Sequence, residues 1–169
     1  MTTELITILA NLALTLSLIV AIIFGIVQVR TAKKDRHERL TLETLRHFQS
    51  REFAELLYYV SRRKVPATLE ELIALPEKEQ VLIIQFGQEM ESLGMLVEER
   101  LIDIDMVDKT LGSFVSTSWN SFSKLYTDIR VKNKDPFLSE YYQLLAERID
   151  KRMKENPRKP FHESSKRRT

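Results

Sequence analysis

The chain has 169 residues, no cysteine, four glycines and five prolines. This length suits one domain with an appendage, and the lack of cysteine excludes a disulfide scaffold, a thiolate nucleophile and an iron–sulfur cluster. The formal net charge of +2 is unevenly distributed. Residues 30–39 hold five basic and two acidic side chains, residues 40–147 hold twelve and eighteen, and residues 148–169 hold nine and three. The sequence therefore describes an acidic body between two basic segments.

Near the start of the chain, residues 5–29 are 25 consecutive residues without a charge. A helix of that length measures about 37 Å, enough to cross a hydrocarbon core of about 30 Å. A secretory leader would begin with basic residues and end at a small-residue cleavage site, whereas this stretch follows Glu4 and ends in Val27-Gln28-Val29. We predict one transmembrane helix over 5–29, with a buried core helix or a cleaved leader as the alternatives.

A basic segment follows the predicted span at residues 30–39, and only Glu4 precedes it. Because positively charged flanks stay in the cytoplasm, we expect the amino terminus outside and the carboxyl-terminal domain in the cytoplasm, with the span in the cell inner (plasma) membrane. Four cations of this segment are expected to contact anionic lipid headgroups, each worth about 1 kcal/mol near the surface: Arg30, Lys33, Lys34 and Arg36.

The predicted span carries small residues at steps of four: Ala13, Ser17, Ala21 and Gly25. Such a stripe lets two helix backbones approach closely in lipid, so it predicts a homo-oligomer formed through the span. A second stripe at the same spacing comprises Thr7, Asn11 and Thr15, where the Asn11 amide could bond across a helix pair. The alternative is that both stripes reflect only the ordinary composition of an anchor.

Beyond the span, residues 30–49 are predicted to form a juxtamembrane basic helix, and residues 50–156 a helical bundle domain. Ser50 is a candidate N-cap, which predicts a bend near 49–51 and a helix that ends before Pro66. Thr68 with Glu71 has the spacing of a capping box for a short helix that ends before Pro76.

The next helix is predicted over 77–99, because apolar residues there alternate steps of three and four. Gly87 and Gly94 lie seven residues apart on one face of it, where missing side chains permit a close approach of another helix. Residues 101–104 are then expected to form a turn, with Asp105 and Asp108 at the start of the following helix.

The remaining apolar positions predict two more helices. The first presents Leu111, Val115, Trp119, Phe122, Tyr126 and Ile129, with Trp119 as a core anchor or as the cap of an interaction surface. The second is expected to begin at Asp135-Pro136, with aspartate as N-cap, and to present Leu138, Tyr142, Leu145, Ile149 and Met153. No useful alternation of period two occurs, so the fold predicted is all-α: one amino-terminal transmembrane helix followed by an antiparallel cytoplasmic helical bundle.

The last thirteen residues, 157–169, contain two prolines, two serines and five cations without an apolar period. This composition predicts a disordered basic tail, solvated or in contact with lipid. Nucleic acid is a less favoured partner, because the tail has few aromatic residues and the body beside it is acidic.

We find no spacing that predicts catalysis, a metal site or a cofactor. Asp103, Asp105 and Asp108 fail the calcium-loop pattern at each later position, and helix capping explains them better. No histidine has a glutamate three residues before it, as a di-iron bundle requires, and His47 is interpreted as a partly exposed structural residue. The pairs Glu89/Glu91 and Glu98/Glu99 do not share a helix face.

Arg130 follows a buried face at the end of its predicted helix. We interpret it as a surface cation at a helix carboxyl terminus, with an ion pair to a carboxylate of the body as the alternative.

The series of spaced residues from 50 to 130 resembles a family of small bacterial proteins with one membrane helix and a helical cytoplasmic domain of unknown function. The markers are Ser50-Arg51-Glu52-Phe53, Gly94-x-Leu96-Val97, Ile102-Asp103, Val107, Trp119 and Ile129-Arg130. The resemblance covers roughly residues 40–147. It implies the same architecture and brings no reaction, ligand or partner.

The favoured function is a membrane-tethered helical interaction or scaffold protein that binds the lipid bilayer and an unknown protein partner. The alternative is a small membrane-active effector or pore former that acts through oligomerised spans. A third hypothesis is an enzyme whose site is assembled between helices from residues that their spacing does not reveal.

Overall fold

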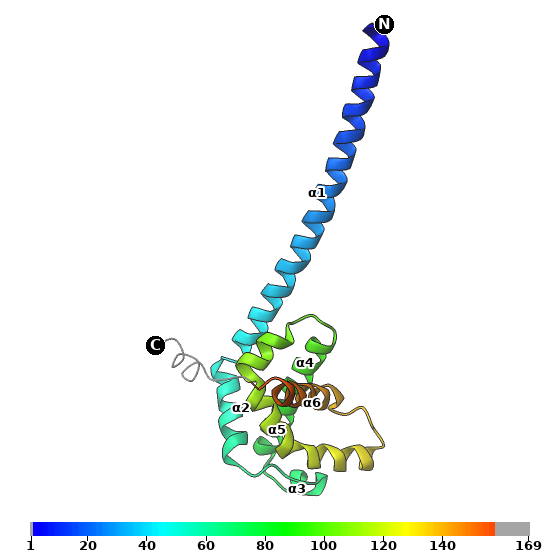
Figure 1. Ribbon diagram of the computed structural model, residues 1–169. Coiled ribbons are helices and arrows are strands. Elements are labelled where there is room, and N and C mark those ends of the chain that lie inside the picture. Colours follow the sequence, from blue (N-terminus) through cyan, green and yellow to red (C-terminus); the bar gives the residue numbers. More distant parts are fainter. Residues whose placement is uncertain (1, 158–169) are drawn as a thin grey trace, which may run out of the picture. The chain divides into compact units, whose positions relative to one another are not determined.

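The computed structural model describes residues 2–157, and in that range the chain forms six α-helices and no β-strand (Figure 1). The helices are α1 (Thr2–His47), α2 (Arg51–Arg62), α3 (Leu69–Ile73), α4 (Glu77–Glu98), α5 (Ile104–Asn133) and α6 (Glu140–Glu155). The all-α class is therefore confirmed over these residues. The disordered tail predicted over 157–169 lies outside them except for Pro157.

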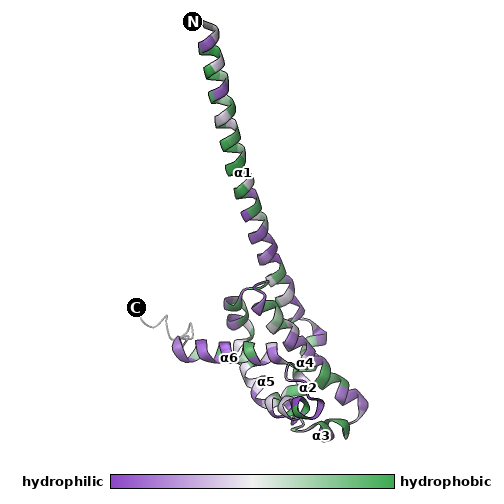
Figure 2. Cartoon of the chain, turned by 90° about the vertical axis from the view of Figure 1, so that its right-hand side faces the viewer, coloured by the Kyte–Doolittle hydropathy of each residue, from purple (hydrophilic) through white to green (hydrophobic). Residues whose placement is uncertain are grey.

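The chain divides into two compact units, Met1–Arg39 and Leu40–Thr169. In the first unit, α1 is long and apolar enough to cross a membrane, as judged by length and composition, with a mean hydropathy of 2.6 over its most apolar 18 residues. None of those residues is buried. Figure 2 shows the apolar stretch of α1 and the polar turns that follow it.

The second unit, here called the helical body over its described residues 40–157, has one continuous apolar core. Helix α2 contributes Phe53, Leu56 and Val60; α4 contributes Ile83, Phe86, Met90, Leu93 and Val97; α6 contributes Tyr142, Leu145 and Ile149. The apolar residues that alternate steps of three and four over 77–99 therefore form the buried face of α4. Rings fill the centre, where Phe86 contacts Phe122 at a centroid distance of 5.0 Å and Tyr142 at 6.4 Å.

Contacts between particular residues give the directions of the helices in the body. Along α2 and α4 the contacts run in opposite directions, since Phe53 meets Phe86 and Tyr59 bonds Glu79. Along α4 and α6 they run in the same direction, since Glu91 bonds the backbone at residue 142 and Glu98 pairs with Arg148. Helices α4 and α6 therefore run alongside each other in parallel.

The start of α2 agrees with its prediction, because the backbone N–H of Phe53 donates to Ser50 Oγ at 3.1 Å. Helix α5 begins one residue earlier than predicted, at Ile104. Its N-cap is Asp103, whose carboxylate accepts from the N–H of Asp105 at 2.8 Å. Asp105 and Asp108 instead face α6, where both pair with Arg152.

The predicted start of the last helix at Asp135-Pro136 is wrong. The Asp135 carboxylate accepts from the N–H of Phe137 at 3.0 Å and closes a turn, and α6 begins only at Glu140. Lys134 and Ser139 at the two ends of this turn have φ of 53° and 57°. A chain in the left-handed region at both points reverses direction too sharply to continue as a helix from residue 136.

Candidate functional site

A cleft of about 620 Å³ opens on the helical body between α3, α4, α5 and the turn before α6. Its apolar wall consists of Leu69 and Leu72 from α3, Ile83 and Ile84 from α4, and Leu125 and Ile129 from α5. Among the residues of 2–157 that line it, Glu91 is the only charged one. An apolar concave surface with a few polar groups is the usual form of a small-ligand site, so we take this cleft as the candidate site.

The wall of the cleft is shaped by the close approach of α4 and α5 at Gly87 and Tyr126. A Cβ atom added at Gly87 would overlap the Tyr126 hydroxyl oxygen. Tyr126 is buried, and its ring stacks on that of Trp119 with centroids 6.0 Å apart and planes 9° from parallel. Gly87 thus lies where α4 and α5 approach closely, and Trp119 is partly buried and packs against the aromatic core.

Burial raises the pKa of Tyr126 to about 12; a hydrogen bond with Ser139 opposes this shift and the charge of Glu91 adds to it. The unfolded chain, with a tyrosine pKa near 10, loses this proton first as the pH rises. The stabilising contribution is therefore complete below pH 10 and is lost as the pH rises towards 12. Two pKa units correspond to about 2.7 kcal/mol.

We expect urea unfolding to show that the wild type loses up to about 2.3 kcal/mol more than Tyr126→Phe between pH 9 and pH 12. Burial also raises the pKa of Tyr142, which is present in both proteins, so the difference isolates Tyr126. Parallel losses of stability in the two proteins would contradict the prediction.

Glu91 stands at the end of the cleft nearest α6. Its carboxylate accepts from the N–H of Tyr142 at 2.7 Å and from the N–H of Tyr141 at 3.3 Å. Both donors belong to the first turn of α6, whose N–H groups have no partner within the helix. Because the Ser139 side chain makes no cap at α6, Glu91 caps that helix from α4, fifty residues earlier in the chain.

Gly94 lies one turn beyond Glu91 on the same face of α4. A Cβ atom there would overlap the backbone carbonyl of Tyr141. The neighbour of Gly94 is therefore backbone, which has less freedom to move than a side chain. Gly87, Glu91 and Gly94 together form the surface on which the start of α6 and the end of the cleft are built.

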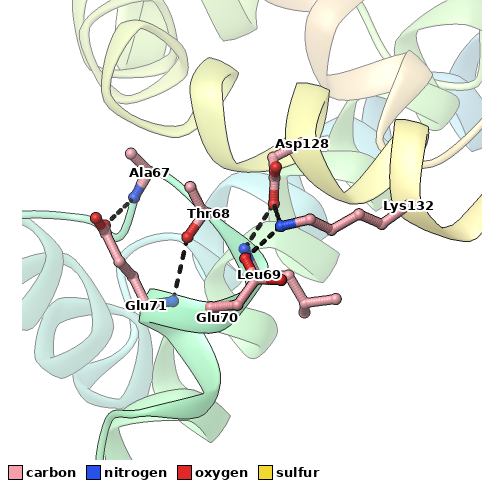
Figure 3. Close-up of polar contacts among 7 residues, drawn as sticks. All are labelled: Ala67, Thr68, Leu69, Glu70, Glu71, Asp128 and Lys132. Carbon is pink, nitrogen blue, oxygen red and sulfur yellow. Dashed lines mark hydrogen bonds and ion pairs between the residues drawn. The ribbon is translucent and has the colours of Figure 1, made fainter.

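Helix α3 closes another side of the cleft and is fixed to α5 by polar contacts (Figure 3). Asp128 accepts from the N–H of Leu69 at 2.8 Å and pairs with Lys132 at 2.7 Å, and Lys132 also pairs with Glu70. These partners lower the pKa of the Asp128 and Glu70 carboxyl groups and raise that of Lys132.

The capping box predicted for α3 is half correct. The N–H of Glu71 donates to Thr68 Oγ1 at 3.2 Å as expected. The Glu71 carboxylate reaches one residue further back, to the N–H of Ala67 at 2.7 Å (Figure 3). Asp128 supplies an acceptor for the N–H of Leu69, so three side chains share the capping of this short helix.

Arg130 fixes the turn that borders the cleft. Its guanidinium donates to the carbonyl of Leu138 at 2.8 Å, to the carbonyl of Ser139 at 3.2 Å and to Gln143 Oε1 at 2.7 Å. These acceptors are carbonyl oxygens, so the carboxylate partner weighed for Arg130 is not among these contacts. Arg130 lies in the last turn of α5, as interpreted, and is partly buried there. Arg130 holds the backbone in the sharp reversal that precedes α6.

The residues predicted for span packing and lipid contact lie in the other unit. Ala13, Ser17, Ala21 and Gly25 are exposed along α1, and nothing lies within 4 Å of a Cβ added at Gly25. Asn11 is exposed too, and its carbonyl accepts from Thr15 Oγ1 at 2.8 Å. The basic residues Arg30, Lys33, Lys34 and Arg36 are exposed, and Lys34 pairs with Glu38 at 3.7 Å.

The acidic residues considered for chemistry have separate structural partners. Glu89 lies 2.8 Å from His47 Nε2, so His47 links the end of α1 to α4 and is half exposed, as interpreted. Glu91 caps α6, and Glu98 pairs with Arg148 at 2.5 Å. Within residues 2–157, no group of three or more histidine, aspartate and glutamate side chains is placed to hold a metal ion.

The sequence contained a signal for this site that its spacing rules missed. Glu91 follows Gly87 by four residues and precedes Gly94 by three, so all three lie on one face of α4. A carboxylate between two glycines on a contact face indicates an acceptor close to another backbone. In sequence, Glu91 was compared only with Glu89, which lies on another face of the helix, and so was not related to the two glycines.

Among known protein families, the one described as a domain of unknown function (DUF4760) matches residues 15–149. The match includes the second half of the apolar stretch of α1 and the chain as far as Ile149 in α6. No curated protein and no solved structure matches the chain.

Proposed function

We propose that this chain, which belongs to the family of the domain of unknown function DUF4760, is a membrane-tethered helical interaction protein. In this proposal α1 crosses the inner membrane once, with its amino terminus outside, and the helical body lies in the cytoplasm. The body contacts a protein partner, and the whole acts by binding rather than by turnover. The specific process it serves is unknown.

The observation that carries this proposal is the exposure of the apolar stretch of α1. Sixteen large apolar side chains between Leu5 and Val29 are about half exposed or more, from 48% at Val20 to 69% at Leu14. Apolar surface of this extent is unfavourable in water, at about 25 cal/mol per Å². A hydrocarbon environment removes that cost, and the helix satisfies its own backbone hydrogen bonds there.

The charges beside the span support the orientation. The cations Arg30, Lys33, Lys34 and Arg36 are exposed and follow the apolar stretch directly, where anionic headgroups on the cytoplasmic side attract them. The acidic residues of the body are used inside the fold, as Glu91 and Asp128 illustrate. That use favours a body that binds over one that catalyses.

The proposal includes an antiparallel bundle for α4, α5 and α6. Successive helices of such a bundle alternate in direction, so the first and third run parallel. The contacts of α4 with α6 follow that parallel direction. Two contacts indicate opposite directions for α5 and α6: Ser118 bonds Tyr142, and Asp108, ten residues earlier, pairs with Arg152.

Membrane insertion is tested by alkaline carbonate extraction of membranes that contain the full chain. We expect the wild type to stay in the membrane pellet and Leu16→Arg/Ile19→Arg to be released, since each arginine near the centre of a span costs about 2.5–3.5 kcal/mol. Leu16→Ile/Ile19→Leu is the matched control and should stay in the pellet. Release of the wild type would overturn the tether.

Orientation is tested separately, with reporters fused after Thr169 that are active on only one side of the membrane. A reporter active in the cytoplasm should give a signal, and one active only outside should not. The reverse pattern would overturn the orientation while leaving the tether intact.

The stripe of small residues that includes Gly25 favours self-association of spans, on which the alternative role as a membrane-active effector also depends. We expect Gly25→Leu with Ala21→Leu to reduce the oligomer of the detergent-solubilised chain to a monomer, because leucine side chains prevent close backbone approach. Leu14→Ile with Leu18→Ile is the control on the same helix. An unchanged oligomer in the leucine variant would mean that the small residues reflect only the ordinary composition of a membrane anchor.

A further inference from the structure

We propose that the cleft between α3, α4 and α5 binds a small amphiphile with an ammonium head and a short apolar body, with the ammonium group held by Glu91. This inference concerns the helical body alone and does not depend on the membrane tether. It rests on the shape of the cleft, on the one charge that lines it, and on the position of that charge at one end.

The shape of the cleft favours a small molecule over a docked helix. The α4 wall from Ile83 to Ser92 covers ten residues, about 14 Å. Helix α3 lies at the Ile83 end, since only three residues join α3 to α4, and the turn at Leu138 and Ser139 lies at the Glu91 end. A docked peptide helix needs a groove several turns long, whereas the α4 wall covers only two to three turns and the volume of 620 Å³ suits a small ligand.

The chemistry at the end of the cleft selects the head group. A carboxylate has about four acceptor positions, and Glu91 uses two for the N–H groups of Tyr141 and Tyr142. The remaining positions favour a donor, and an ammonium group is the strongest donor available to a carboxylate. A ligand with a carboxylate or phosphate head would meet like charge.

Two uncharged polar residues lie beside Glu91 in sequence. Gln88 and Ser92 line the cleft from α4, one before and one after Glu91. In the proposed complex the Gln88 amide oxygen and the Ser92 hydroxyl accept from the other N–H groups of a primary ammonium, which has three donors. The apolar residues of α3, α4 and α5 then enclose the hydrocarbon part.

The chain has a natural reporter of this cleft in Trp119, its only tryptophan, which stacks on Tyr126 of the cleft wall. We would titrate the full chain in amphipol at pH 7 with hexylammonium, 1-hexanol and hexanoate, and record tryptophan emission. We expect a saturable change, with hexylammonium bound roughly ten times more tightly than hexanol and hexanoate weakest. A change that stays linear with concentration, or hexanoate binding as tight as hexylammonium, would overturn the proposal.

Substitutions at Glu91 test its role directly. In Glu91→Gln the amide oxygen still accepts from α6, and the preference for hexylammonium over hexanol should fall from about tenfold to about one. Glu89→Gln is the matched control, since Glu89 lies two residues away and contacts His47 outside the cleft; it should keep the preference. An unchanged preference in Glu91→Gln would overturn the proposal.

A second variant keeps the test decisive should Glu91→Gln fail to fold. Gln88 is exposed and lines the cleft, so Gln88→Lys places a cation beside Glu91 without disturbing the core. It should weaken hexylammonium binding at least fivefold and strengthen hexanoate binding. If both affinities stay unchanged, the head group does not lie at this end of the cleft. Because Trp119 reports only on the body, either result is independent of membrane extraction.

Discussion

Phe86→Ala should lower the free energy of unfolding of the helical body by about 3–5 kcal/mol, as truncation of a buried phenylalanine to alanine typically does. Phe86 is fully buried, and its ring contacts those of Phe53, Phe114, Phe122 and Tyr142. Its removal leaves a cavity bounded by four rings from α2, α5 and α6, which cannot all move inward together. Urea denaturation followed by circular dichroism of the full chain in detergent measures this loss.

Phe137→Ala is the matched control, because Phe137 is 68% exposed in the turn before α6. Its truncation should change the stability by no more than about 0.5 kcal/mol. Equal effects at the two positions, or a loss below 1 kcal/mol at Phe86, would mean that the ring cluster is not the centre of the core.

Gly94→Ala should destabilise the body by about 2 kcal/mol, even though alanine favours a helix over glycine by about 1 kcal/mol. The added methyl group would overlap the carbonyl of Tyr141, so α4 and α6 have to separate. Separation also lengthens the bonds by which Glu91 caps α6. Thermal unfolding of wild type and variant under the same conditions tests this expectation.

Two other glycines serve as comparisons for Gly94. Gly87→Ala should cost less, because the nearest atom that the methyl group meets is the far end of the Tyr126 side chain, whereas at Gly94 it is backbone. Gly25→Ala, with no neighbour within 4 Å, should leave the unfolding of the body unchanged. A Gly94→Ala protein as stable as wild type would show that α4 and α6 do not pack as closely as described.

Local patterns predicted the helices well where the decisive contacts are themselves local. The apolar period of residues 77–99 marked the buried face of α4 because each turn of a helix repeats the same direction. Ser50 was recognisable as an N-cap because the hydroxyl that accepts the hydrogen bond and the N–H of Phe53 that donates it lie only three residues apart.

The same reasoning was wrong where a distant residue decides the outcome. Asp135-Pro136 has the pattern of a helix start, but Arg130 holds the carbonyls of Leu138 and Ser139 and fixes a turn there. Glu91 caps a helix fifty residues away, and Asp128 caps one fifty-nine residues away. No rule based on spacing along one element contains these partners, so the cleft that they border could not be predicted.

The order of the helices along the chain has a consequence for synthesis of the protein. The face of α4 that carries Phe86 and Met90 is completed by Tyr142, Leu145 and Ile149 of α6, the last of the described helices to be made. Fifty-two residues separate Val97 from Ile149, which at about 5–20 residues per second takes roughly 3–10 s. During that interval the nascent chain exposes the apolar face of α4, so α4 is the region of the body at which we expect chaperones to bind during translation.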